Sequence, residues 1–235
     1  MGDEVFGIGK GAFAELAVVP VEKLVHKPDG LAFERAAAVP ISGLTALHAV
    51  RDVGKVGPGQ SVLVIGASGG VGTYAVQIAK AAGAEVTGVC STAKLDLVRS
   101  LGADHVVDYT REDLVELGQR YDVVIDIAGN RRLRQLRRVL APKGTLVIVG
   151  GEEGGRWLGG IQRNLWASLW SPCIEPRVRA FVSRERGEDI EVLAGMTVAG
   201  TVTPVVERTF PLADAAEAIR HLDAGHARGK VVVTV

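Results

Sequence analysis

The stretch GQSVLVIGASGGVG, residues 59–72, decides how this chain folds. Its apolar run at residues 62–65 is typical of a strand, and Gly66, Gly69 and Gly72 follow at three-residue spacing before a helical pattern begins. A tight turn between strand and helix lets the backbone approach a pyrophosphate, whose charge is met by the N–H groups and positive dipole end of a helix beginning near Gly70. Small residues are required there because a Cβ would meet the phosphate or the strand.

A glycine-rich turn alone is also compatible with a strand-to-helix connection that binds nothing. A dinucleotide fold expects a second strand about 20 residues further on, and residues 85–90 form one. Ala67 stands where the usual pattern has its first glycine, so the turn is a Gly-x-x-Gly-x-x-Gly variant. With the second strand in place, we favour dinucleotide binding over the inert connection.

The end of this second strand indicates which dinucleotide binds. A site for NAD places Asp or Glu there to accept the ribose hydroxyls, and that carboxylate would repel a 2′-phosphate. Here the chain continues through Ser91 and Lys94, with no carboxylate before Asp96. A hydroxyl and an ammonium suit a phosphate, so the sequence favours NADPH. A solvated lysine in the first turn of a helix is the alternative for Lys94.

Beyond this stretch, strands and helices alternate. We expect strands at 62–66, 85–90, 105–107, 122–127 and 144–149, and helices near 70–82, 92–101, 111–118 and 130–140. This alternation predicts an α/β fold with a doubly wound parallel sheet of the Rossmann type. Ligands bind at the carboxyl ends of strands in such sheets. That rule adds two loops of small residues to the cofactor site, Ala128 with Gly129 and Val149 with Gly150.

The regions before and after this alternating segment have other patterns. Short strands are expected at 3–8, 14–19 and 23–26, helices divided by Pro40 at 31–53, and a domain boundary near 57–59. Later, a strand at 177–183 and a helix at 187–198 are expected, and strands at 201–210 and 230–235 return to the N-terminal module. The tryptophans Trp157, Trp166 and Trp170 favour packing over a substrate lid.

Several motifs along the chain resemble one known family. The run from Gly59 through Gln77 and Lys80, with its paired glycines, is similar to the signature of the zinc-independent quinone oxidoreductase/zeta-crystallin-like branch of the medium-chain dehydrogenases/reductases. Other similar pieces are Gly2-Asp3-Glu4-Val5, Ala37-Ala38-Val39-Pro40, Leu101-Gly102-Ala103-Asp104, Asp108-Tyr109 and Gly229-Lys230-Val231-Val232. The resemblance covers essentially the whole chain.

The resemblance implies a domain plan and a cofactor site. Residues 1–57 would be a partial GroES-like catalytic domain, whose earlier part we expect upstream, residues 58–200 the NADP-binding Rossmann domain, and residues 201–235 a return to the catalytic domain. Tyr109 would pack near the adenosine phosphate. With the residues reached above, the implied cofactor-binding set is Thr45, Ser68, Gly69, Gly70, Val71, Ser91, Lys94, Tyr109, Ala128, Gly129, Val149, Gly150 and Lys230.

The function implied is an NADPH-dependent oxidoreductase that transfers hydride to a quinone or an α,β-unsaturated carbonyl, with no metal. The protein would contribute positioning and exclusion of water rather than a covalent nucleophile, and no general acid is assigned. The alternative is a truncated, non-catalytic NADPH-binding or interaction protein. A strand at 177–183 on the sheet edge, together with the family, implies a homodimer.

Composition excludes other classes of partner. The 235 residues carry 27 basic and 27 acidic side chains, which gives no electrostatic reason to expect nucleic acid or an anionic membrane as partner. No apolar run reaches the roughly 18 residues of a membrane span. Cys90 and Cys173 are too few for a disulfide framework, so we expect a cytoplasmic protein acting on a small molecule.

Other chemistries fit the residues less well. The histidines do not cluster with either cysteine at zinc-ligand spacing. Short-chain dehydrogenases share a glycine-rich turn but need Tyr-x-x-x-Lys, and none of Tyr74, Tyr109 and Tyr121 has a lysine four residues later. The arginines between Arg131 and Arg138 read as a solvated helix face rather than a nucleic-acid site, because no aromatic platform accompanies them.

Overall fold

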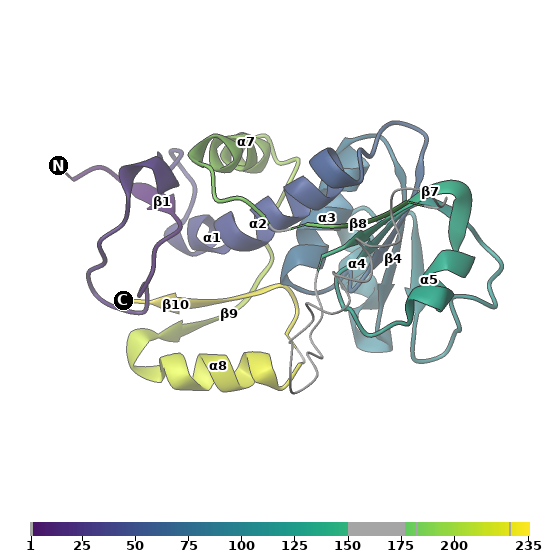
Figure 1. The fold of residues 1–235 in the computed structure, drawn as a ribbon. Coiled ribbons are helices and arrows are strands. Elements are labelled where there is room, and N and C mark those ends of the chain that lie inside the picture. Colours follow the sequence, from purple (N-terminus) through teal and green to yellow (C-terminus); the bar gives the residue numbers. More distant parts are fainter. Residues whose placement is uncertain (1, 150–176, 182, 226) are drawn as a thin grey trace.

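A six-stranded parallel sheet forms the centre of the molecule in the computed structural model, which describes residues 2–149, 177–181, 183–225 and 227–235 (Figure 1). Neighbouring strands follow the order β5-β4-β3-β6-β7-β8, and every neighbouring pair is parallel. The strands are β3 (Ser61–Ile65), β4 (Glu85–Cys90), β5 (His105–Asp108), β6 (Tyr121–Asp126), β7 (Leu140–Ile148) and β8 (Arg177–Ala180). The predicted doubly wound sheet is confirmed, with its reversal of strand order between β3 and β6.

Both faces of this sheet are buried, which explains why its strands read as continuous apolar runs. Along β3, Val62 and Val64 belong to one hydrophobic cluster, while Leu63 and Ile65 belong to a second. Successive side chains of a strand point to opposite faces, so the two clusters lie on opposite sides of the sheet.

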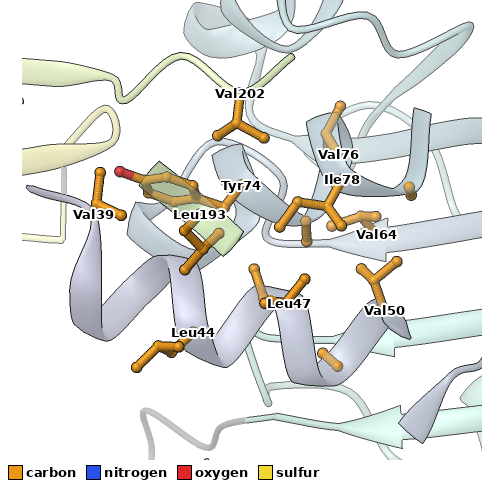
Figure 2. Packing of buried hydrophobic residues seen from close by; sticks show 14 of the residues in the cluster. Val39, Leu44, Leu47, Val50, Val64, Tyr74, Val76, Ile78, Leu193 and Val202 are labelled. Carbon is orange, nitrogen blue, oxygen red and sulfur yellow. The ribbon is translucent and has the colours of Figure 1, made fainter. Parts of the chain in front are cut away.

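The helices cover these faces. They are α2 (Pro40–Leu47), the π-helical turn η2 (His48–Val53), α3 (Gly70–Ala81), the 3₁₀ turn η3 (Thr92–Lys94), α4 (Leu95–Ser100), α5 (Leu133–Arg138) and α7 (Gly187–Val198). Helix α2 packs against both α3 and α7, and Figure 2 shows Leu47 of α2 on the side of α3, where Tyr74 and Ile78 lie. The hydroxyl of Tyr74 in α3 donates to the Ala38 carbonyl at 3.1 Å, which satisfies this fully buried side chain.

The N- and C-terminal parts lie together at the end of the molecule away from the sheet (Figure 1). Strands β1 (Val5–Gly7) and β2 (Leu24–His26) pair antiparallel, and β9 (Val206–Pro211) and β10 (Lys230–Thr234) pair parallel. Helix α1 (Phe33–Ala38) contacts both β9 and β10. The remaining elements are α8 (Ala215–Asp223) and the 3₁₀ turns η1 (Val21–Lys23) and η4 (Leu212–Asp214). The division of the chain into three domains stays a prediction.

Two expected elements are wrong. Residues 14–19 form no strand. The side chains of Leu16 and Val18 are 91% and 96% exposed, which shows that no neighbouring strand covers them. Residues 111–118 form turns rather than a helix, because the Asp113 carboxylate accepts from the Val115 N–H and competes with helical bonding. The tryptophans lie outside the described residues. Within the described chain, no helix has the length and apolar character needed to cross a membrane.

A partly buried polar cluster ties α7 to the π-helical turn η2. The carboxylate of Asp189 lies 3.0 Å from Nε2 of His48 and 2.8 Å from Nη2 of Arg51, while Nδ1 of His48 lies 3.0 Å from the Ser183 hydroxyl. A carboxylate only accepts, so Nε2 of His48 donates to Asp189. Burial alone would raise the pKa of Asp189, but the hydrogen bonds from His48 and Arg51 outweigh burial and hold the pKa below its ordinary value.

This cluster predicts acid-sensitive stability. Because the folded pKa of Asp189 is depressed, its stabilisation is fully present above the unfolded value of about 3.8 and is lost as the pH falls through the lower folded pKa. At pH 7, Asp189→Asn should lower the free energy of unfolding by about 1–3 kcal/mol. Urea unfolding should show this difference shrinking below about pH 4. Asp52→Asn, at a side chain that is 46% exposed, is the control and should cost under about 1 kcal/mol. A pH-independent cost at Asp189 would contradict the assignment.

Candidate functional site

The glycine turn after β3 brings the start of α3 against the end of the strand. Gly66 has φ +88°, a conformation that side chains rarely adopt, and its N–H donates to the Val89 carbonyl of β4 at 3.2 Å. A Cβ added at Gly72 would lie 2.0 Å from the Gly66 carbonyl oxygen, so no other residue fits there without moving the helix. The first N–H groups of α3 have no carbonyl four residues earlier inside the helix. The turn therefore presents backbone donors at the carboxyl end of β3, which suits an anion.

A cavity of about 630 Å³ lies at this end of the sheet, a volume in the usual range for small-molecule sites. It is lined from the ends of β3, β4 and β6 and from the segment before β10. The lining includes most of the predicted cofactor residues, namely Ser68, Gly69, Gly70, Val71, Ser91, Lys94, Tyr109, Ala128 and Lys230. The structure thus brings together side chains that are separated by up to about 160 residues in the sequence.

Four predicted residues stand apart from this lining. Thr45 does not line the cavity, and its hydroxyl donates to the Ile41 carbonyl within α2 at 2.8 Å. Gly129 adopts φ +70° between two lining residues, and Val149 packs against a hydrophobic cluster while its N–H donates to the Asp126 carbonyl. Gly150 lies outside the described residues.

The charged side chains on the cavity wall are all cationic. Lys94, Arg131 and Lys230 line the cavity, and no Asp or Glu of the described chain does so. Three positive charges on one concave surface repel each other unless an anion lies among them. The cavity is therefore suited to a ligand with several negative charges.

The carboxylate of Asp108, the last residue of β5, bonds to partners outside the cavity lining. Asp108 is 4% exposed and accepts from the hydroxyls of Thr92 and Thr110 and from the Thr110 N–H. The Thr92 hydroxyl in particular holds the pKa of Asp108 below its ordinary value, so this carboxylate is ionised at neutral pH. Because Asp108 is fully engaged away from the cavity, it does not replace the acidic residue that is absent after β4.

Lys94 is already engaged with the opposite wall of the cavity. Its Nζ donates to the carbonyl oxygen of Ala227 at 2.8 Å, across 133 positions of sequence. Ser91 precedes it at the end of β4, and Tyr109, whose N–H donates to the Cys90 carbonyl, is 54% exposed beside them. A hydroxyl, an ammonium and a phenol thus share the mouth of the cavity.

The segment before β10 closes the cavity from the other side. The Gly229 N–H donates to the Ser68 carbonyl at 3.0 Å, so this segment is bonded directly to the glycine turn. The Arg228 N–H donates to the Glu207 carboxylate at 3.0 Å and the Lys230 N–H to the Val205 carbonyl at 2.8 Å. A Cβ at Gly229 would lie 2.5 Å from that same carbonyl oxygen, so glycine is needed where the segment turns.

Sequence reasoning missed several lining residues. Arg131 was assigned to a solvated helix face, but α5 begins only at Leu133, and Arg131 lies in the loop after β6, on the cavity wall. The rule that ligands bind at the carboxyl ends of parallel strands would have identified Arg131 as a lining residue. Ser42, Leu222, Gly225 and Ala227 also line the cavity, and no local motif distinguishes them.

The described residues do not form a metal centre. No group of three His, Cys, Asp or Glu side chains in the described part of the chain is placed to hold a metal ion. The thiol of Cys90 is buried, and burial raises its pKa to about 11, which disfavours the thiolate that zinc binds. We therefore assign no zinc-dependent step to these residues.

Comparison with known proteins gives the family. A family model described as zinc-binding dehydrogenase matches residues 101–233, more than half of the chain. The chain is 35% identical to the mitochondrial NAD(P)H oxidoreductase RTN4IP1 of Mus musculus, over 100% of this chain and 65% of that protein. It is 30% identical to the chloroplast envelope quinone oxidoreductase homolog of Arabidopsis thaliana, over 99% of this chain and 72% of that protein.

A solved structure of the quinone oxidoreductase from Coxiella burnetii has the same fold, with a TM-score of 0.86 and 28% identity, over 100% of this chain and 73% of that one. The chain spans about 65% of the length of the RTN4IP1 proteins it matches. Sequence and fold agree, and the chain belongs to the zinc-binding dehydrogenase family, in the quinone-oxidoreductase branch of the medium-chain dehydrogenases/reductases.

Proposed function

We propose that this chain binds NADPH and serves as an oxidoreductase that reduces a quinone or an α,β-unsaturated carbonyl. The observation that carries the proposal is the cavity over the glycine turn, whose charged side chains in the described chain are Lys94, Arg131 and Lys230. Two relatives point the same way, since one is called an NAD(P)H oxidoreductase and another, from Arabidopsis thaliana, an NADPH-dependent alkenal/one oxidoreductase.

Each part of the cavity has a role in this proposal. The backbone N–H groups of Gly70 and Val71 and the ammonium of Lys230 hold the diphosphate. Ser91, Lys94 and Tyr109 receive the 2′-phosphate, and no carboxylate of the described cavity wall opposes that charge. The loop with Ala128 and Gly129 holds the nicotinamide end, by its place at the carboxyl end of β6. The expected contribution of Val149 and Gly150 to this end stays a prediction from the sequence.

The bound nicotinamide supplies a hydride to an electron-poor acceptor. The chain positions the two reactants and excludes water from the space between them, which can account for roughly 7–11 kcal/mol of a barrier. Ile65, Val89 and Ile127 give the cavity an apolar floor.

A second candidate is an NADPH-binding protein without reductase activity. No residue from 2 to 41 lines the cavity, and the described N-terminal part contributes only the two short strands β1 and β2. This candidate predicts strong cofactor binding with slow or absent turnover by the 235-residue chain.

One pair of measurements on the same preparation separates the candidates. NADPH binding is followed by cofactor fluorescence, and NADPH oxidation by absorbance with a quinone and with an enal. The reductase predicts oxidation that depends on the acceptor, whereas the binding protein predicts saturable binding with oxidation no faster than the protein-free background. Failure to bind NADPH would contradict both.

The choice of cofactor gives a sharper prediction. A charge-assisted contact to phosphate is worth roughly 1.5–3 kcal/mol, so Lys94→Ala should weaken NADPH about tenfold or more and leave NADH nearly unchanged. Fluorescence titration of both cofactors measures this difference. Lys94→Arg keeps the charge and should retain most of the preference for NADPH. Equal affinities of the unmodified protein for the two cofactors would rule out the 2′-phosphate site.

We also propose a homodimer formed through β8. This strand is last in the order of the described sheet. A strand at the edge of a sheet can pair with the same strand of a second copy about a two-fold axis. Sedimentation velocity at micromolar concentration should show the dimer mass. A monomer over the whole concentration range would exclude this assembly.

A further inference from the structure

Lys230 differs from other lysines of the chain in its surroundings. Lys23, Lys27 and Lys80 each form an ion pair with a carboxylate, at Glu185, Glu4 and Asp104 respectively. The Nζ of Lys230 instead donates to the hydroxyl of Ser42 at 3.1 Å. A hydroxyl both donates and accepts, so this partner serves the neutral amine as well as the ammonium.

Burial opposes the protonation of Lys230. It lines the cavity with Lys94 and Arg131, and no carboxylate of the described chain shares that wall. Burial lowers the pKa of Lys230 below its ordinary value. Because only the neutral amine is nucleophilic, each unit by which the pKa falls raises the reactive fraction at neutral pH about tenfold.

The first turn of α3 lies next to this amine. A Cβ added at Gly70, the first residue of α3, would lie 3.2 Å from Cδ of Lys230 and 3.2 Å from the Ser42 hydroxyl oxygen. The lysine stem therefore runs past the first turn of a twelve-residue helix, where backbone donors have no partner inside the helix. A phosphate bound there brings an attached group close to the amine.

We propose that Lys230 is a covalent modification site for aldehydes that carry a phosphate or similar anion. The neutral amine attacks the aldehyde carbon, and the carbonyl oxygen leaves as water with both amine protons, which gives an imine. The proposal goes beyond the proposed reductase function and does not depend on it, because it requires only the amine, the cavity and the first turn of α3.

Pyridoxal 5′-phosphate followed by borohydride is the probe. Borohydride adds hydride to the imine carbon, and a proton from water completes a stable secondary amine that peptide mapping can locate. Lys230 should be labelled about tenfold or more faster than the exposed Lys55 and Lys143. Pyridoxal, which lacks the phosphate, should label Lys230 more slowly. Equal labelling of all lysines, preferential labelling of Lys94, or equal rates with the two reagents would overturn the proposal.

Variants and competition refine the test. Lys230→Arg should remove the fast label, whereas Lys94→Arg, at the other lysine of the cavity, should leave it. Saturating NADPH should slow labelling of Lys230 at least about tenfold if the cofactor fills this cavity. Fast labelling without protection by NADPH would support the modification site but contradict the assignment of the cofactor to this cavity. The test can therefore contradict either proposal without the other.

Discussion

The close approach of α3 to the end of β3 is the constraint on which the rest of the structure depends. With no side chain at Gly66 or Gly72, the helix begins at the carboxyl end of the strand, and a single added Cβ would come within 2.0 Å of a carbonyl oxygen. The same turn offers the Ser68 carbonyl to the N–H of Gly229, so the C-terminal segment is attached to it. Sheet, helix and cavity wall meet at this one turn.

The positive charge of the cavity comes from residues at the ends of several strands. Lys94 comes from the turn after β4, Arg131 from the loop after β6, and Lys230 from β10, and no carboxylate of the described chain lines the cavity with them. Asp108, at the end of β5, is held by two threonine hydroxyls. Such a wall is unfavourable when empty and favourable around a dinucleotide with several phosphate charges. No carboxylate of the described residues lines the cavity with Lys230, and the reactivity that we propose for its amine rests partly on that.

Sequence patterns predicted the elements that depend mainly on residues close together in the chain. Apolar runs and glycine spacing placed β3, β4 and α3, and the strand-end rule placed Ala128 in the cavity wall. Arg131 was missed because the expected helix began at residue 130, three residues before α5 begins at Leu133. The wall formed by Gly225 and Ala227 could not be predicted from spacing, since it reaches the glycine turn only through tertiary packing more than 150 residues away. The apolar pattern at 14–19 failed because a strand needs a partner.

The central claim is that NADPH occupies the cavity between the glycine turn and the segment before β10. A crystal structure of the full chain with NADPH tests it most directly. The account predicts the diphosphate against the N–H groups of Gly70 and Val71, with the 2′-phosphate beside Ser91 and Lys94. A cofactor bound elsewhere, for example in the second pocket, which Gln77, Leu97 and Pro204 line, would contradict it.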